Sequence, residues 1–159
     1  MVNATMNMPR EPSISRMPHS TPGVPAAIAA KLRHPERCVV AFAGDGDFMM
    51  NGQELATAMQ YQANIIIVVV NNGIYATIRM HQEREYPHRV IGTDMINPDF
   101  VALAQAYGAH GELVVKTDDF EAAFARSKAA GKPALIEVRL DPDILTPTAT
   151  VAGLRAAKN

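Results

Sequence analysis

The sequence predicts an α/β fold: a doubly wound, mainly parallel sheet with helices on both faces. Two short apolar runs, residues 38–43 and 65–70, are rich in β-branched side chains and show no polar–apolar alternation. Such runs are typical of strands that are buried on both faces of a parallel sheet. The stretch between them has helical spacing, so strand, helix and strand form a right-handed crossover unit.

The helix between these strands is predicted over residues 51–62. Asn51 is a suitable N-cap, and Glu54 follows three residues later, as in a capping box. One face of this helix would carry Leu55, Ala58, Met59 and Gln62.

The other elements follow from similar signals. A helix over residues 23–32 has Pro25 near its first turn, and residues 74–84 form another. Asn97 and Pro98 are expected to cap a helix that stops at Gly108, and Asp118 with Glu121 a helix that closes at Gly131. The last strands are predicted over residues 113–116 and 135–140, which completes an order of strands alternating with helices.

The same patterns predict which side chains are buried. Cys38 is expected to be a small core residue. The charged run 81–89 is expected to be exposed, and residues 86–93, which contain Pro87 and Gly92, to form a lid. Core positions are assigned to Ala26, Ile28, Ala29, Leu32, Phe120, Ala123 and Phe124.

Three segments are expected along the chain. Residues 1–22 are polar, contain four prolines and lack periodicity, so an irregular or disordered segment is predicted there. Residues 23–140 form the folded domain. Residues 141–159 follow the strand-breaking Asp141-Pro142 pair and are expected to be a surface arm.

Composition excludes several classes of protein. The 159 residues are 48% hydrophobic and 19% charged, with a net charge of −1, which are ordinary globular values. The sequence contains no basic block of the kind that would indicate a nucleic-acid partner. It also contains no apolar run long enough to span a membrane. A single cysteine and the lack of a signal-peptide pattern favour a cytoplasmic protein.

Two polar turns follow the first two predicted strands: Gly44-Asp45-Gly46 and Asn71-Asn72-Gly73. Each alone is typical of a tight turn. In an open α/β sheet, however, both strand ends lie at one edge, where ligands bind. A carboxylate and an amide oxygen suit Mg²⁺, which usually takes its remaining ligands from water and phosphate. Together the turns therefore predict a metal-bridged diphosphate site.

These turns and their surroundings resemble a known family. The spacing is similar to the thiamin diphosphate motif: GDG is followed by 24 residues (47–70) and then by NN. The surrounding sequence is similar to the C-terminal cofactor domain of the acetolactate synthase and benzoylformate decarboxylase superfamily. The resemblance implies the thiamin diphosphate-binding fold. It implies Mg²⁺ bound by Asp45, Asn72 and the main-chain oxygen of Ile74, and diphosphate contacts from the backbone of Gly44, Gly46, Asp47 and Phe48.

The chain departs from the family pattern in one place, and another position distinguishes types within the family. Residues 16–22 read RMPHSTP where a glycine-rich segment with a large apolar residue usually precedes the cofactor site. Ile78 stands where some decarboxylases of the family carry a glutamate, which favours the acetolactate synthase and benzoylformate types. Ile78 and His81 are candidates to face substrate, although a lone histidine is more often a surface residue.

The resemblance implies a reaction of 2-oxo acids that this chain cannot complete alone, because the glutamate that activates the cofactor belongs to a pyrimidine-binding domain. Three hypotheses remain open: part of an acetolactate synthase-like enzyme, one subunit of a two-chain 2-oxo acid decarboxylase with a separate pyrimidine-domain chain, or a non-catalytic relic that self-associates. Loss of neighbouring domains would expose apolar surface, so a homo-oligomer is expected.

Overall fold

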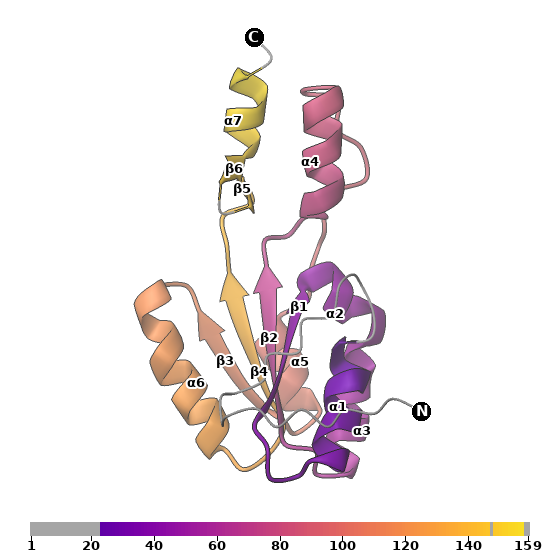
Figure 1. The fold of residues 1–159 in the computed structure, drawn as a ribbon, viewed down its shortest axis with the longest axis vertical. Coiled ribbons are helices and arrows are strands. Elements are labelled where there is room, and N and C mark those ends of the chain that lie inside the picture. Colours follow the sequence, from indigo (N-terminus) through magenta and orange to yellow (C-terminus); the bar gives the residue numbers. More distant parts are fainter. Residues whose placement is uncertain (1–22, 147, 158–159) are drawn as a thin grey trace, which may run out of the picture.

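The computed structural model describes residues 23–146 and 148–157. Four parallel strands form the central sheet in the order β1-β2-β4-β3 (Figure 1). Their bounds are Val39–Gly44 for β1, Ile65–Asn71 for β2, His110–Val114 for β3 and Ala134–Arg139 for β4. The predicted fold class is therefore confirmed, with each predicted strand displaced by one to three residues at most.

Helical segments connect these strands. They are α1 (Gly23–Arg33), α2 (Asp45–Asn51), the 3₁₀ turn η1 (Gly52–Glu54), α3 (Leu55–Gln60), α4 (Ala76–Glu85), α5 (Phe100–Ala106), the 3₁₀ turn η2 (Thr117–Asp119), α6 (Phe120–Ala129) and α7 (Val151–Ala156). Two short antiparallel strands, β5 (Ile144–Thr146) and β6 (Ala149–Thr150), precede α7.

The two faces of the sheet are covered unequally. The larger core cluster joins β1, β2 and β4 to α1, α2, α3 and α5, with Phe48, Leu55 and Phe100 at most 1% exposed. The smaller cluster lies on the opposite face, where α6 contacts β3 and β4 and contributes Ala123, packed with Phe120 and Phe124. β2 lies in the interior of the sheet and has five buried residues in succession.

β1 differs from the prediction because it is an edge strand. It was expected to be buried on both faces, yet Phe42 is 57% exposed and Cys38 is also exposed. α6 contacts β3 and β4 rather than β1, so the second face of β1 is left open. An apolar run without alternation identified the strand correctly, but it could not reveal its position at the edge.

Several predicted helix details are wrong. The helix after β1 begins at Asp45 instead of Asn51, and Glu54 accepts a hydrogen bond from Thr57 Oγ1 at 2.7 Å in place of a capping box. In α1, Ala29 and Leu32 are exposed while Val24 and Ala27 are buried, because the face toward the sheet is rotated from the expected one.

Helix starts later in the chain also differ. Asp99, not Asn97, caps α5 by accepting a hydrogen bond from Ala102 N at 2.9 Å. The Asp118–Glu121 capping box does not form, since a 3₁₀ turn occupies residues 117–119 and α6 starts at Phe120 without a side-chain cap.

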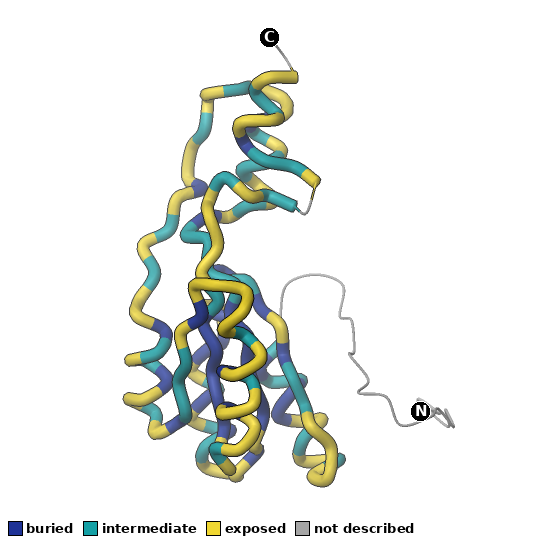
Figure 2. The backbone as a smooth tube through the Cα atoms, turned by 90° about the vertical axis from the view of Figure 1, so that its left-hand side faces the viewer, coloured by how far each residue is buried: buried dark blue, intermediate teal, exposed yellow. Residues whose placement is uncertain are grey.

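Two helices extend beyond the carboxyl ends of the strands. α4 follows β2 and α7 ends the described chain, and they lie side by side above the sheet in Figure 1. The segment expected to be a surface arm thus forms β5, β6 and α7, with α7 packed on α4. Figure 2 shows buried residues concentrated in the sheet, with mostly half-buried or exposed ones in this helix pair. We refer to α4 and α7 together as the helix pair.

None of the helices in the described part of the chain is long and apolar enough to cross a membrane.

Candidate functional site

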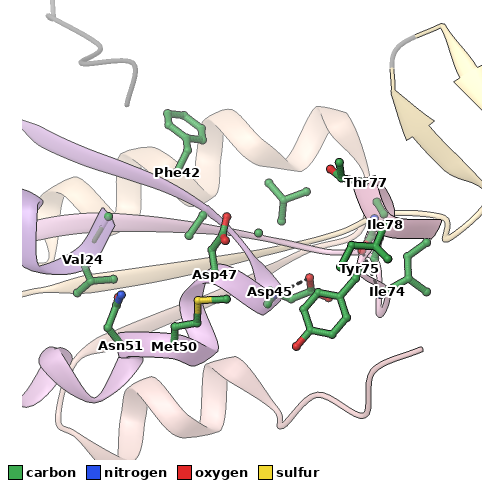
Figure 3. A pocket seen from close by; sticks show the side chains of 17 residues that line it. Val24, Phe42, Asp45, Asp47, Met50, Asn51, Ile74, Tyr75, Thr77 and Ile78 are labelled. Atoms are coloured by element: carbon green, nitrogen blue, oxygen red, sulfur yellow. Dashed lines mark hydrogen bonds between the residues drawn. The ribbon is translucent and has the colours of Figure 1, made fainter. Parts of the chain in front are cut away.

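A cavity of about 650 Å³ opens at the carboxyl ends of β1 and β2. Its volume is within the range typical of small-molecule and cofactor sites. Figure 3 shows its lining side chains, with Val24 and Asn51 at one end and Thr77 and Ile78 of α4 at the other. The lining residues are Gly23, Val24, Phe42, Ala43, Gly44, Asp45, Gly46, Asp47, Met50, Asn51, Val70, Asn72, Ile74, Tyr75, Ala76, Thr77 and Ile78.

Asp45 is a buried carboxylate that accepts hydrogen bonds only from neutral donors. It is the first residue of α2 and 3% exposed. Its Oδ1 accepts from the main-chain N of Gly46 at 2.9 Å, and its Oδ2 from Gly73 N at 2.9 Å and Asn97 Nδ2 at 2.7 Å. Within the described residues, no lysine, arginine or histidine forms an ion pair with it. A buried anion without a cationic side chain is the kind of group that a metal ion neutralises.

The two asparagines after β2 have different environments. Asn72 lines the cavity, and its Oδ1 accepts a hydrogen bond from Ile74 N at 3.2 Å. Asn71 instead donates from Nδ2 to Glu137 Oε1 at 2.8 Å, beneath the site. Gly73 adopts a φ of +68°, a left-handed conformation that glycine adopts without strain, and this turn separates the two side chains.

Gly46 allows a close contact inside the site. A Cβ at this position would lie 2.7 Å from Cε1 of Tyr75, so any larger residue would displace the ring. Tyr75 lies just before α4, is 39% exposed and lines the cavity. The acidic turn at Gly46 therefore packs closely against Tyr75 in the segment after β2.

The structure brings most of the predicted site residues together and leaves two out. Gly44, Asp45, Gly46, Asp47, Asn72, Ile74 and Ile78 all line the one cavity. Phe48 does not; its side chain is in the core, in an edge-to-face contact with Phe100 at 5.5 Å between ring centroids. His81 lies on α4, is exposed and is outside the cavity lining.

Sequence reasoning missed several residues at this site, Tyr75 and Asn97 among them. Tyr75 stands two residues after the asparagine turn, so its position could have been anticipated. Asn97 was interpreted only as a helix cap, yet it contacts Asp45 across 52 positions of sequence. No local sequence pattern predicts that contact, because it depends on how residues 93–97 are placed against the sheet in the folded chain.

A second buried carboxylate lies above the site, in a run that was expected to be exposed. Glu83 of α4 is fully buried and accepts hydrogen bonds from Arg155 Nε at 3.0 Å, Arg79 Nε at 3.2 Å and His88 N at 3.0 Å. The Arg155 guanidinium, helped by His88 N and Arg79 and opposed by burial, lowers the pKa of Glu83 to about 2. Glu83 is therefore ionised and links α7 to α4.

The donor set around Asp45 suits a hard cation. Among the described residues, no group of three or more His, Cys, Asp or Glu side chains is arranged to hold a metal. A cation here would rest on one carboxylate, the Asn72 amide and main-chain oxygen, which is a set suited to Mg²⁺ and not to zinc. The main-chain oxygen of Ile74 accepts one hydrogen bond, from Ala76 N at 2.9 Å, and so retains a free lone pair.

Comparison with known proteins agrees with the fold and the place of the cavity. Residues 15–138 match the family described as thiamine pyrophosphate enzyme, C-terminal TPP binding domain. The match covers most of the chain. The fold and the cavity thus define the class of protein: an α/β cofactor-binding domain whose cavity lies at the carboxyl ends of two neighbouring parallel strands. The chain belongs to the thiamine pyrophosphate enzymes, in their C-terminal TPP-binding domain.

Similar proteins include acetolactate synthases. The acetolactate synthase isozyme 2 large subunit of Escherichia coli K12 is 38% identical over 120 residues, covering 75% of this chain and 22% of that protein. The mitochondrial acetolactate synthase catalytic subunit of Saccharomyces cerevisiae is 34% identical over 122 residues, covering 77% and 18%. The chain therefore spans about a fifth of the length of these curated relatives.

A solved structure is similar as well. The thiamine diphosphate-dependent 4-hydroxybenzoylformate decarboxylase of Rhodococcus jostii RHA1 superposes with a TM-score of 0.69 at 38% sequence identity, covering 75% of this chain and 23% of that one. The resemblance stated from the residues alone is confirmed by these relatives.

Proposed function

We propose that the cavity binds Mg²⁺ and the diphosphate end of thiamine pyrophosphate, as part of an acetolactate synthase-like enzyme that acts on 2-oxo acids. The observation that carries this proposal is Asp45. It is a buried carboxylate with only neutral hydrogen-bond donors, and it shares one cavity with Asn72. Family membership supplies the cofactor, and these two side chains supply the position for its metal.

Each predicted residue has a physical role in this proposal. The Asp45 carboxylate, the Asn72 amide oxygen and the Ile74 main-chain oxygen would hold the Mg²⁺. The main chain at Gly44, Gly46, Asp47 and Phe48 would face the diphosphate, since Gly44, Gly46 and Asp47 line the cavity.

The cofactor, when bound, supplies a carbanion and an electron sink for 2-oxo acids. The chain's own contribution is to hold and shield it. Ile78 is 52% exposed and lines the cavity at the base of α4, so it would form an apolar wall toward the substrate. An apolar wall favours an uncharged substrate side chain. His81 remains a candidate only if substrate extends beyond the lining residues.

Decarboxylation of a 2-oxo acid is the second candidate. It is favoured by the likeness to the Rhodococcus jostii decarboxylase, which equals the similarity to the Escherichia coli acetolactate synthase at 38% identity. In either case we propose that a pyrimidine-binding domain, in this protein or in a separate chain, supplies the groups that activate the cofactor. Without it, this domain would be catalytically incomplete.

Self-association is part of the proposal. The open face beside Phe42 forms an apolar groove of about 370 Å³, lined in part by Val68, Val70, Val138 and Leu140. Covering this groove with a second copy would bury apolar surface. A monomer by light scattering at micromolar concentration would count against it. The single cysteine, Cys38, is exposed and unpaired, and free thiols are typical of a reducing compartment, so we propose a cytoplasmic location.

Isothermal titration calorimetry with thiamine pyrophosphate and Mg²⁺ tests the metal site. Asp45→Ala and the isosteric Asp45→Asn should both abolish binding, because each removes the anionic ligand. Asp118→Ala removes the same charge from an exposed turn and should bind normally. If the unaltered chain gives no heat at millimolar cofactor, it is a relic without a working site; if Asp45→Ala binds as well as the unaltered chain, the ligand assignment is wrong.

A further inference from the structure

The segment before α5 pairs with the residues that follow β2. Residues 93–95 pair antiparallel with residues 73–75: Met95 N donates to Gly73 O at 2.8 Å, and Tyr75 N donates to Thr93 O at 2.8 Å. This pairing fixes the backbone leading to Asn97. Asn97 itself is half-buried and is not among the residues that line the cavity.

The Asn97 amide joins two residues of the site. Its Nδ2 donates to Asp45 Oδ2 at 2.7 Å and to Asn71 Oδ1 at 2.9 Å. Its own Oδ1 is buried without a hydrogen-bond partner. An unpartnered buried oxygen is unfavourable, but the reversed amide would place oxygen against both of those acceptors. The amide orientation is therefore determined by Asp45 and Asn71.

Counting acceptor sites shows the consequence for Asp45. An ionised carboxylate has about four lone-pair positions, two on each oxygen. Oδ2 accepts from Gly73 N and Asn97 Nδ2, so both of its positions are used. Oδ1 accepts from Gly46 N alone. One position on Oδ1 is left for a cation.

Asn97 is itself held by residues of the central strands β2 and β4. Asn71 Oδ1 accepts from Asn97, and Asn71 Nδ2 donates to Glu137 Oε1 at 2.8 Å. Glu137 is 1% exposed in β4 and also accepts from Arg139 Nε at 3.0 Å. A continuous line of hydrogen bonds therefore runs from the carboxylate at the cavity to a buried acid in the neighbouring strand.

We propose that Asn97 is a positioning residue for the cation site: it completes the hydrogen bonds to Oδ2 of Asp45, so that the carboxylate is held in one rotamer with the remaining position on Oδ1 directed to the metal. This inference rests on the proposed function of Asp45. Partners that orient a metal ligand typically change metal affinity by about 10–100-fold when removed.

The experiment measures binding of Mn²⁺, with thiamine pyrophosphate present, by electron paramagnetic resonance. Asn97→Ala should weaken Mn²⁺ binding at least tenfold and broaden the spectrum of the bound ion, because the carboxylate gains rotational freedom. Asn97→Ser, which keeps one donor, should fall between Asn97→Ala and the unaltered chain. The matched control is Asn64→Ala, which loses an asparagine hydrogen bond to Gly131 O at the opposite end of β2 and should bind Mn²⁺ normally.

The outcomes separate this inference from the proposed function. If the unaltered chain binds Mn²⁺ and Asn97→Ala binds within twofold of it, the positioning role is wrong while the metal site stands. If Asn97→Ala fails to fold, the Asn97→Ser affinity decides by the same criterion.

If the unaltered chain binds no Mn²⁺, the proposed function fails, and the role of Asn97 is judged without metal. Urea midpoints of Asp45→Ala, Asn97→Ala and the double variant then form a cycle in chelator. A double variant that is less destabilised than the sum of the two single changes supports the contact. Additive changes overturn it.

Discussion

The sheet and the helix pair are stabilised by different forces. In the sheet, β2 has a succession of apolar side chains buried between two hydrophobic clusters. In α4, the only buried residue is Glu83, and it is held by Arg79, Arg155 and the main chain of His88. Apolar burial is non-directional and spread over many contacts, whereas the contact between α4 and α7 includes directional hydrogen bonds from Arg155 to the buried Glu83 carboxylate.

This difference bears on the site, which lies where the two regions meet. Asp45 and Asn97 belong to the sheet side, while Ile78 extends from α4. The carboxylate proposed as a cation ligand is thus held from the sheet side, whereas the apolar wall belongs to a helix of the helix pair. Weakening the helix pair should disturb the substrate side of the cavity before it disturbs the metal side.

The largest effect is expected from Phe48→Ala, which breaks the sheet region. Phe48 is 1% exposed and packs edge-to-face on Phe100, so its loss should cost about 3–5 kcal/mol of unfolding free energy. Met50→Ala in the same helix is the control, because Met50 is 54% exposed and should change stability by under about 0.5 kcal/mol. Urea denaturation followed by circular dichroism measures both. Equal midpoints would show that α2 is not part of the core.

Arg155→Ala should have a smaller and more local effect. Removing Arg155 leaves the buried Glu83 carboxylate with only Arg79 and His88 N as donors, which is destabilising, and here the loss should be confined to α4 and α7. Hydrogen exchange should speed up at the amides of these helices while the β2 amides keep their protection. Arg84→Ala changes an exposed arginine of α4 and serves as control. Uniform exchange across both regions would contradict the comparison.

Acid should weaken the helix pair by the same route. Arg155 first, then His88 N and Arg79, hold the pKa of Glu83 near 2, below its usual 4.5. The stabilisation is therefore complete above pH 4.5 and is lost as the pH falls from 4.5 toward 2. The side-chain Nε–H resonance of Arg155 should report this loss by NMR, and Glu83→Gln should abolish the pH dependence of that resonance.

A second acid, Glu112, responds in the same pH range, so the measurement has to be specific to Glu83. Arg126, and then His110, hold the pKa of Glu112 near 2 as well, so β3 and α6 respond to the same pH range. A global stability curve would mix the two groups. In Glu83→Gln the Glu112 response should remain, and its disappearance would show that the two regions are coupled.

The sequence by itself determined the four strands of the main sheet, their parallel arrangement and the candidate ligands. Apolar β-branched runs longer than a turn can form stable structure only by burial, so residues 38–43 and 65–70 identified β1 and β2 within one residue at each end. The polar turns after them had to lie at one edge of the sheet, because parallel strands joined by a helix end on the same side. Asp45 and Asn72 accordingly line one cavity.

Only the tertiary structure decided the rest. Whether β1 is central or at the edge depends on which helices cover it, and that left Cys38 and Phe42 exposed. Glu83 was indistinguishable from a solvated charge until α7 brought Arg155 beside it, 72 positions later. Asn97 likewise meets Asp45 only through the fold. Burial and long-range hydrogen bonds join residues that are far apart in sequence, so no local pattern can encode them.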